Sequence, residues 1–240
     1  MPRFFLPVSE NDSFITVTGD NARHISRSLR MKIGEELTVT CQGTDYKCDI
    51  SEIDSESVTL RIISAERCQA EPDVKITLYQ AVPKSDKLEF IIQKAVELGV
   101  TAIVPVMTRR CVSRPSQKDF ARKLVRFEKI AHEASKQSGR GIIPSVSEIV
   151  PFKTAVSMMQ NDDRAVMLYE NGGIHFSETG IEKAESISIL VGSEGGFDEE
   201  EAEYAKSCGI IPVWLGRRIL RCETAPVAAL SIAMFMTKNI

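Results

Sequence analysis

The sequence predicts an α/β protein in which a small β-rich domain precedes a larger domain with a mainly parallel sheet. Up to about residue 70, short β-rich runs follow one another with no room for crossover helices between them. Beyond Pro72, apolar runs that indicate buried strands alternate with segments of helical periodicity. A polar stretch broken by Pro72 separates the two patterns, so we expect domains over residues 1–70 and 73–240.

The first domain is expected to be a small antiparallel barrel or sandwich. Its strands show partial alternation of apolar and polar residues and are expected over residues 14–18, 36–40, 46–50 and 57–63. One helix is expected over residues 20–30, because Ile25 and Leu29 lie four residues apart. Asp20 is a suitable N-cap for that helix.

The second domain alternates strand and helix, which favours a mainly parallel sheet with helices on both faces. Strands are expected over residues 75–82, 102–106, 165–169, 187–191 and 210–215. Helices are expected between Asp86 and Gly99 and over residues 117–137, 152–160, 198–208 and 224–238. Glu89 is expected to complete a capping box with Asp86, and Gly99 to end that helix.

The composition excludes several classes of protein. A hydrophobic content of 43% is ordinary for a folded globular protein, and no apolar run approaches the roughly 20 residues of a membrane span. The N-terminus lacks the features of a signal peptide, and the six scattered cysteines without a C-x-x-C pair fit reduced thiols. With three dispersed histidines, we expect a cytoplasmic protein with neither a metal site nor a histidine-dependent catalytic triad.

One basic segment contrasts with the formal net charge of -3. Between Arg109 and Arg140 the chain carries ten lysines and arginines against three acidic residues. Polyanion binding depends on such a local basic face rather than on the net charge. Two interpretations stay open from this segment alone: a nucleic-acid-binding face, or the solvated side of an amphipathic helix.

Two glycine-marked loops, Leu190 to Phe197 and Leu215 to Pro226, are the most informative feature of the chain. Each follows an apolar run typical of a buried strand and precedes a segment typical of a helix. Because open α/β sheets bind ligands at the carboxyl ends of their strands, the two loops are expected to form one pocket. The alternative is a pair of tight strand–helix turns that bind nothing.

The first loop lacks the composition of a phosphate site. Gly192-Ser193-Glu194-Gly195-Gly196 has neither the terminal Gly-Lys-Ser/Thr of a P-loop nor the spacing of a dinucleotide fingerprint. The helix that follows begins with Asp198-Glu199-Glu200-Glu201, whose carboxylates repel a phosphate from the helix N-terminus. S-adenosylmethionine suits the loop better, because glycine backbone can approach its adenosine closely and Glu194 can offset the charge of its sulfonium.

The second loop carries Arg217, Arg218 and Arg221 together with Glu223. Thr224 is a suitable N-cap for the helix that follows, and Pro226 is tolerated in its first turn. One interpretation is a capped helix with an Arg221–Glu223 ion pair at its start. The other is a loop whose backbone closes over the ligand while an arginine faces the substrate.

An ordered set of motifs covers nearly the whole chain and occupies residues 80–84, 87–100, 110–111, 133–135, 137–140, 192–196 and 215–225. This set resembles the SPOUT class of knotted methyltransferases, and most closely the bacterial family that methylates uracil N3 in 16S ribosomal RNA. The departures are mild: Ser193 stands where proline is common, and Arg217 where proline also occurs. The resemblance implies a PUA-like RNA-binding barrel followed by an α/β domain with a trefoil knot, a rare exception to unknotted connections. It also implies a homodimer, S-adenosylmethionine as cofactor, and 16S ribosomal RNA of the 30S subunit as substrate.

The resemblance further implies cofactor contacts made mostly by backbone groups. These residues are Leu168, Tyr169, Val191, Gly192, Ser193, Glu194, Gly195, Gly196, Leu215, Gly216, Ile219 and Leu220. In catalysis an arginine is expected to stabilise the uracil anion, with Arg140 and Arg221 ahead of Arg110 as candidates. Glu223 or Glu194 is available to accept the N3 proton. The arginines expected to contact RNA are Arg3, Arg23, Arg27, Arg30, Arg109, Arg110 and Arg114.

Two other functions stay open. One is a non-catalytic RNA-binding or ribosome-assembly factor on the same scaffold, which cofactor binding would separate from an enzyme. The other is a knotted methyltransferase that acts on tRNA or on ribose, which the identity of the modified nucleoside would reveal. The apolar stretch Ala228 to Met236 of the last helix is expected to pack at a subunit interface or on the knot, with burial in the core alone as the alternative.

Overall fold

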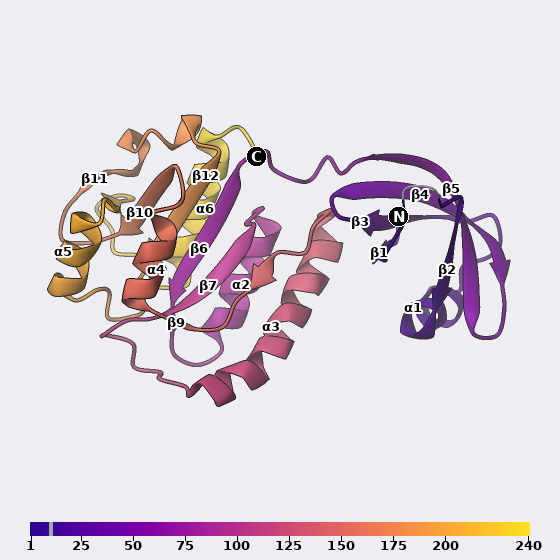
Figure 1. Cartoon of the computed structure of the whole chain (residues 1–240), viewed down its shortest axis with the longest axis horizontal. Helices are drawn as coiled ribbons and strands as arrows, with labels where there is room; N and C mark the ends of the chain where they lie inside the picture. The colour runs from indigo at the N-terminus through magenta and orange to yellow at the C-terminus, as the bar shows by residue number, and fades with distance from the viewer. Residues whose placement is uncertain (10–11) are drawn as a thin grey trace. The chain divides into compact units, whose positions relative to one another are not determined.

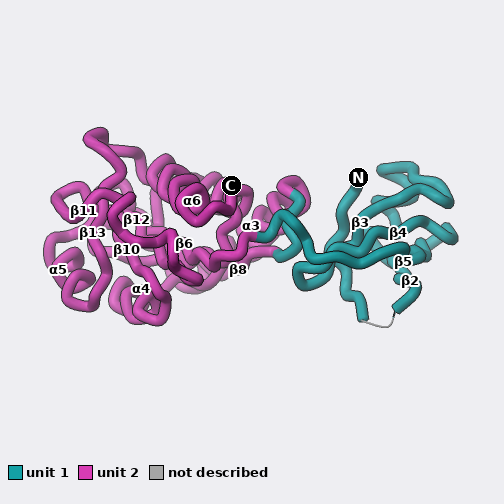
Figure 2. The backbone as a smooth tube through the Cα atoms, turned by 90° about the horizontal axis from the view of Figure 1, so that it is seen from above, with its two compact units in different colours: residues 1–71, 139–142 teal, residues 72–138, 143–240 magenta. Residues whose placement is uncertain are grey.

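The structure, a computed structural model, describes residues 1–9 and 12–240 and divides into two compact units (Figure 2). Unit 1 comprises residues 1–71 and 139–142, and unit 2 comprises residues 72–138 and 143–240. The sequence indicates a boundary near Pro72, but none of its patterns indicates that residues 139–142 return to unit 1.

Unit 1 is built on a five-stranded sheet in the order β1-β3-β4-β5-β2. Its strands are β1 (Arg3–Phe5), β2 (Phe14–Thr18), β3 (Glu36–Cys41), β4 (Thr44–Ile53) and β5 (Ser57–Arg67). All neighbouring strands pair antiparallel except β1 and β3, which are parallel. In β2 the alternation visible in the sequence buries Ile15 and Val17 and leaves Phe14, Thr16 and Thr18 exposed. A mainly antiparallel N-terminal domain is therefore confirmed.

The helix expected over residues 20–30 is only partly correct. α1 spans Gly19–Arg23, and a π-helical segment follows over His24–Ser28. The wider turn of this segment is closed by the Leu29 N–H, which donates to His24 O at 2.9 Å. Asp20 does not cap α1 but forms an ion pair with Arg23 inside the helix.

Unit 2 contains an eight-stranded sheet in the order β11-β13-β10-β12-β6-β7-β8, with β9 also paired to β7 (Figure 1). Its strands are β6 (Lys75–Ala81), β7 (Ala102–Met107), β8 (Ser145–Val146), β9 (Val150–Pro151), β10 (Arg164–Leu168), β11 (Ile174–His175), β12 (Ser186–Val191) and β13 (Ile211–Trp214). The pairs are all parallel across the described residues, so the predicted parallel sheet is confirmed. The trefoil knot implied by the resemblance stays a prediction.

Helices cover both faces of this sheet, as the alternation of strand and helix predicted. They are α2 (Lys87–Glu97), α3 (Gln117–Ser138), α4 (Phe152–Met159), α5 (Glu199–Ser207) and α6 (Thr224–Met236). α2, α3 and α6 share one core with the sheet, and α4 and α5 share another (Figure 1). Consecutive residues of β12 point into different cores, Ile189 into the first and Leu190 into the second, so the two cores lie on opposite faces.

One predicted helix cap is correct only in its position, and another is wrong. Asp86 takes the predicted N-cap position of α2, but across the described residues its side chain makes no cap hydrogen bond, so the capping box with Glu89 is not formed. Thr224 is the first residue of α6 rather than its cap, a position that Glu223 takes. Tertiary ion pairs of Glu89 with Arg126 and of Glu223 with Lys87 replace the local capping that the sequence indicates.

No helix within residues 1–9 and 12–240 is long and apolar enough to cross a membrane. The same residues contain no group of three or more histidine, cysteine, aspartate or glutamate side chains that could hold a metal ion. The six cysteines are free thiols.

Candidate active site

A cavity of about 820 Å³ opens at the carboxyl ends of neighbouring strands of the unit 2 sheet. β13, β10 and β12 lie side by side and end at Trp214, Leu168 and Val191, all of which line the cavity. The loops that follow β12 and β13 contribute most of its remaining wall. The two glycine loops therefore form a single pocket, as their positions after buried strands predicted.

The residues that the sequence assigned to the cofactor come together in this cavity. Its lining includes Leu168, Tyr169, Val191, Gly192, Ser193, Glu194, Gly195, Gly196, Leu215, Gly216, Ile219 and Leu220. Of the catalytic candidates, Arg221 lines the cavity, Glu223 follows the lining residue Cys222, and Arg140 belongs to unit 1. Their chemical roles stay predictions.

The first glycine loop is a tight turn held by its own backbone and by a neighbouring loop. Gly196 adopts a φ of +64°, and its N–H donates to Ser193 O at 3.0 Å. From the loop after β7, Arg110 Nη1 donates to Gly195 O at 3.1 Å. Ser193 Oγ in turn donates to Arg110 O at 3.3 Å. Arg110, expected from the sequence to act on RNA or uracil, therefore supports the first glycine loop.

The carboxylates after the first loop occupy the N-terminus of α5. The Glu200 N–H donates to Asp198 Oδ1 at 3.2 Å, and the Asp198 N–H donates to Glu201 Oε2 at 3.2 Å, as parts of a capping box. Glu201 is buried and also accepts a hydrogen bond from the Arg109 N–H. Because carboxylates already use N–H groups that could bind a phosphate, this helix end is poorly suited to an anionic ligand.

The second loop presents its arginines to the cavity. Arg217, Arg218 and Arg221 are exposed and line it. Gly216 has a φ of +147°, and a Cβ at this position would meet no atom within 4 Å, so its backbone borders open space. No Arg221–Glu223 ion pair forms among the described residues, because Glu223 pairs with Lys87 instead.

Lys87, which we did not single out from the sequence, links the two loops. Its Nζ lies 3.0 Å from Glu194 Oε1 and 3.1 Å from Glu223 Oε2. Cys222 lies beside this pair and donates from Sγ to Glu223 Oε2 at 3.2 Å. The sequence does carry a signal: Lys87 is the first residue of α2, where the helix dipole disfavours a cation unless carboxylates compensate for it.

Gln80, on β6, is a second residue whose role the sequence did not reveal. Its side chain is fully buried, and Nε2 donates to Gly192 O at 3.2 Å and to Ala81 O at 3.0 Å. Within the described part of the chain, Gln80 Oε1 has no hydrogen-bond partner, which costs free energy in a strand interior. The compensating contact to Gly192 fixes the start of the first loop. A polar side chain in the apolar run of residues 75–82 was the available signal.

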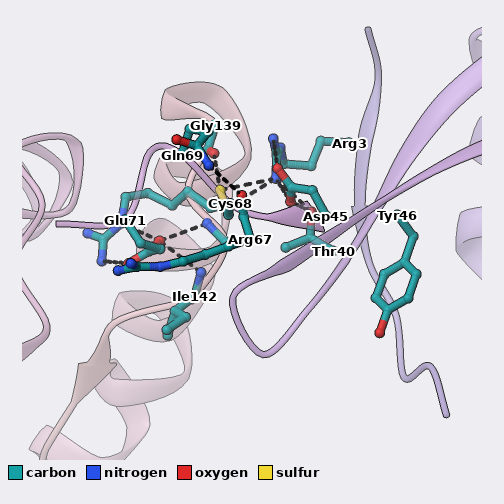
Figure 3. A network of polar contacts seen from close by, with 12 residues as sticks. Arg3, Thr40, Asp45, Tyr46, Arg67, Cys68, Gln69, Glu71, Gly139 and Ile142 are labelled. Atoms are coloured by element: carbon teal, nitrogen blue, oxygen red, sulfur yellow. Dashed lines mark hydrogen bonds and ion pairs between the residues drawn. The ribbon is translucent and has the colours of Figure 1, made fainter. Parts of the chain in front are cut away.

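Arg140 lies in unit 1 and forms an ion pair with Glu71, which belongs to the network of polar contacts in Figure 3. Its Nη2 lies 2.8 Å from Glu71 Oε2 and its Nε 2.9 Å from Glu71 Oε1, and only 3% of Arg140 is exposed. Glu71 also accepts hydrogen bonds from the Gly141 and Ile142 N–H groups, at 2.7 and 3.0 Å. These contacts hold residues 139–142 in unit 1. They give Arg140 a structural role, and its catalytic role stays a prediction.

The arginines expected to contact RNA differ in how far they are already engaged. Arg3, Arg23 and Arg109 form ion pairs within the chain, with Asp45, Asp20 and Asp198. Arg110 and Arg114 donate to backbone carbonyls, whereas Arg27 and Arg30 are exposed. An arginine that must first break an ion pair with a carboxylate gains less free energy from binding a phosphate. Arg27 and Arg30 are therefore the stronger candidates for RNA contact.

Most of the basic segment lies in α3 (Gln117–Ser138), which is an amphipathic helix. Phe120, Phe127 and Ala131 on one side are buried in the core of unit 2. Arg122 and Lys123 are exposed. The segment is thus an amphipathic helix with a solvated basic side, which both interpretations require, and RNA binding by that side stays a prediction.

The lining of the cavity fits an adenosyl ligand that carries a positive charge. The volume lies within the range of small-molecule sites. Leu168, Val191 and Ile219 offer apolar surface to an adenine ring, and Glu170 and Glu194 offer negative charge to a sulfonium. S-adenosylmethionine combines these properties.

Comparison with known proteins identifies the class to which this architecture belongs. The RNA methyltransferase domain family matches residues 70–234, and the RNA methyltransferase PUA domain family matches residues 17–63. Fold and cavity together are those of a two-domain RNA methyltransferase. The ribosomal RNA small subunit methyltransferase E of Bacillus subtilis is 33% identical over 250 residues, which cover 99% of this chain and 98% of that protein. The chain belongs to the ribosomal RNA small subunit methyltransferase E family.

Solved structures agree with this membership. The ribosomal RNA small subunit methyltransferase E of Neisseria gonorrhoeae, solved bound to S-adenosylmethionine, has a TM-score of 0.86 at 31% identity and covers 98% of this chain and 97% of its own. A methyltransferase of Legionella pneumophila, also solved with S-adenosylmethionine, has a TM-score of 0.85 at 28% identity, with 97% and 96% covered. The family that the sequence motifs indicated is confirmed.

Proposed function

We propose that this protein transfers a methyl group from S-adenosylmethionine to N3 of a uridine in 16S ribosomal RNA. The observation that carries the proposal is the cavity, on which both glycine loops of the methyltransferase domain converge. Family membership, and the cofactor bound in the Neisseria and Legionella structures, support S-adenosylmethionine as the ligand of this cavity.

In this proposal the strand ends and the backbone of both glycine loops hold the cofactor, and the arginines of the second loop face the RNA. When bound, S-adenosylmethionine supplies an electrophilic methyl group on its sulfonium. Uracil N3 lies on the pairing edge of the base, so the target uridine must be unpaired or flipped out before it reacts. Arg221, which lines the cavity, is proposed to stabilise the negative charge on the uracil carbonyl oxygens as N3 loses its proton. Orientation of both reactants in one cavity adds to the rate.

Methyl transfer to purified 30S subunits tests this proposal. With radiolabelled S-adenosylmethionine, we expect the label in 3-methyluridine of the 16S RNA, identified by mass spectrometry of the digested nucleosides. Cofactor binding is measured separately through the fluorescence of Trp214, the sole tryptophan of the chain, which lines the cavity. Label in tRNA or on a ribose hydroxyl would identify the alternative methyltransferase, and absence of cofactor binding would identify a non-catalytic RNA-binding factor.

We further propose that the protein acts as a homodimer on the 30S subunit in the cytoplasm. α6 buries Ala229, Leu230 and Ala233 in the core of unit 2, so one side of the helix packs within the chain. Phe235 of the same helix is nevertheless 73% exposed, and Ile219 of the second loop is 87% exposed. Exposed large apolar side chains of this kind support an interface with a second copy.

Sedimentation at micromolar concentration tests the dimer. We expect the wild type to sediment as a dimer and Phe235→Glu to shift the equilibrium towards monomer, because a buried carboxylate without a partner opposes association. The same substitution at the exposed residue Val125 of α3 serves as the control and should leave the dimer unchanged. A wild-type monomer at this concentration would contradict the proposal.

A further inference from the structure

Lys87 lies where a helix disfavours a cation, and its neighbours explain how it is tolerated. It is the first residue of α2, close to the positive end of the helix dipole. Glu194 of the first loop and Glu223 before α6 approach it within 3.0 and 3.1 Å. These carboxylates lie more than a hundred residues away along the sequence, in different loops. The contact is therefore tertiary and spans both walls of the cavity.

We propose that Lys87 is a positioning residue that joins the two cofactor loops through Glu194 and Glu223. The inference rests on the proposed function, because it concerns the cavity that the cofactor is proposed to occupy. Lys87 is not part of the lining of that cavity and acts on its shape through the two carboxylates. The same segment anchors the first loop a second time, because the Lys84 N–H donates to Glu194 Oε1 at 3.1 Å. Lys87 therefore connects an already anchored loop to the second one.

A displaced carboxylate would move the wall of the cavity directly. Glu194 lies between Ser193 and Gly195, which line the cavity together with it. Glu223 follows Cys222, another lining residue. Without Lys87 the two carboxylates would lose the cation between them and repel each other, so the loops would separate at this point.

The charged groups around Lys87 also bear on the fate of the N3 proton. Partial burial acts to raise the pKa of Glu194, but hydrogen bonds from backbone N–H groups and from Lys87 outweigh it and leave the pKa lowered. The hydrogen bond from Cys222, together with that from Lys87, lowers the pKa of Glu223. Burial, and then the hydrogen bond to Glu223, raise the pKa of the Cys222 thiol to about 12, so the thiol stays protonated and donates.

Both carboxylates are consequently ionised but weakly basic at neutral pH. A carboxylate with a lowered pKa is a poor acceptor for a proton from uracil N3. In this proposal Lys87 holds Glu194 and Glu223 together through its contacts of 3.0 and 3.1 Å, and the two carboxylates serve to fix the loops. The rate then depends on how well the two loops orient the reactants.

Substitutions of Lys87 test this role, with Lys94 of the same helix as a matched control. Lys94 forms an ion pair with Glu97, and its side chain is about as exposed as that of Lys87, at 34% against 29%. We expect Lys87→Met to weaken S-adenosylmethionine binding by about tenfold, the loss of a hydrogen bond between charged groups. Lys87→Arg should retain most of the affinity, and Lys94→Met should match the wild type. Calorimetric titration measures all four proteins.

Hydrogen–deuterium exchange of the protein without cofactor supplies an independent readout. Lys87→Met should speed exchange at residues 193–196 and 222–224, and Lys94→Met should not. Because Lys87→Met leaves two carboxylates without the cation between them, adding Glu223→Gln should slow that exchange again if repulsion is the cause.

Three results would overturn the inference. The first is unchanged cofactor affinity and exchange in Lys87→Met. The second is equal weakening by Lys87→Arg and Lys87→Met, which would show that shape rather than charge matters. The third is exchange that Glu223→Gln does not slow. If the wild type itself binds no S-adenosylmethionine, the proposed function fails, while the exchange experiment still decides whether Lys87 joins the loops.

Discussion

Replacing Gly192 with alanine is expected to weaken S-adenosylmethionine binding while the protein remains folded. A Cβ at this position would lie 3.0 Å from Gly196 Cα, 3.2 Å from Gly196 C and 3.3 Å from Phe197 Cε2. Two of these atoms are backbone of the same loop, so they cannot move aside as a flexible side chain would. The added methyl group would therefore push the first loop open where it borders the cavity.

The surroundings of the loop leave little room for this change. Gln80 Nε2 donates a hydrogen bond to the Gly192 carbonyl, and the Gly196 N–H donates one to Ser193 O. Arg110 packs against Gly195 from the adjacent loop. Overpacking of this kind costs about 1–3 kcal/mol, and we expect most of it in the cofactor affinity, as a decrease of roughly ten- to hundredfold. Calorimetric titration of the cofactor, with thermal unfolding of the free protein, measures both effects.

Gly209→Ala is the matched control for this experiment. Gly209 has a φ of +87°, but a Cβ there would meet no atom within 4 Å. Alanine at this position should lower the free energy of unfolding by about 1–2 kcal/mol through backbone strain and leave the cofactor affinity unchanged. Equal affinity losses in the two variants, or wild-type affinity in Gly192→Ala, would contradict a specific requirement for glycine in the first loop.

The parts of the fold that the sequence predicts are those decided by local pattern. Leu88, Ile91 and Ile92 follow helical spacing, and α2 buries all of them in the core. The strands of the parallel sheet are continuous apolar runs, because helices cover both faces. The cavity follows from the same logic: a glycine loop after a buried strand lies at the ligand-binding edge of an α/β sheet, whatever the ligand.

The parts that the sequence does not predict are decided by residues distant along the chain. β8, β9 and β11 each have two residues, too few for any periodicity, and exist only as partners of longer strands. Asp86 takes the N-cap position of α2 without the expected side-chain hydrogen bond, and the charged residues beside it, Lys87 and Glu89, form ion pairs with distant residues. The role of Lys87 depends on carboxylates that no local window contains. Residues 139–142 join unit 1 through Glu71, again a contact without a sequence pattern.

Arg140 illustrates how a motif can combine structural and chemical requirements. It belongs to a motif of the family, and its residue type suits stabilisation of a uracil anion. The structure buries it against Glu71, with 3% of the residue exposed. A sequence does not distinguish an arginine that pairs with a buried carboxylate from one that faces a substrate, because both require the same side chain. Stability measurements make that distinction.

Arg140→Met is expected to lower the free energy of unfolding by about 3–5 kcal/mol, the cost of removing one partner of a buried ion pair. Glu71→Leu should lower the free energy of unfolding by at least as much, because it also leaves the Gly141 and Ile142 N–H groups without their acceptor. Chemical denaturation of both variants measures these losses. In the Glu71→Leu/Arg140→Met double variant we expect the losses to be less than additive, since no charge is then left unpaired.

The pH dependence of the stability lost in Arg140→Met follows from the pKa of Glu71. Burial acts to raise this pKa, but the hydrogen bonds and charge of Arg140, with the two backbone N–H groups, outweigh burial and hold it below the ordinary 4.5. A carboxylate with a lowered folded-state pKa stabilises the protein above its unfolded-state pKa and loses that contribution as the pH falls through the folded-state pKa. The difference in the free energy of unfolding between the wild type and Arg140→Met should therefore be largest at neutral pH and should decrease as the pH falls below 4.5.

The same variant separates the structural role of Arg140 from its predicted catalytic role. If Arg140 only holds residues 139–142 in unit 1, Arg140→Met should bind S-adenosylmethionine normally in Trp214 fluorescence, because the cavity lies wholly in unit 2. Its kcat on 30S subunits, corrected for the folded fraction, should then fall by no more than about tenfold. Wild-type stability with a hundredfold or greater loss of kcat, on the order of the contribution of one preorganised charge-stabilising donor, would instead identify Arg140 as a catalytic residue and Glu71 as the group that positions it.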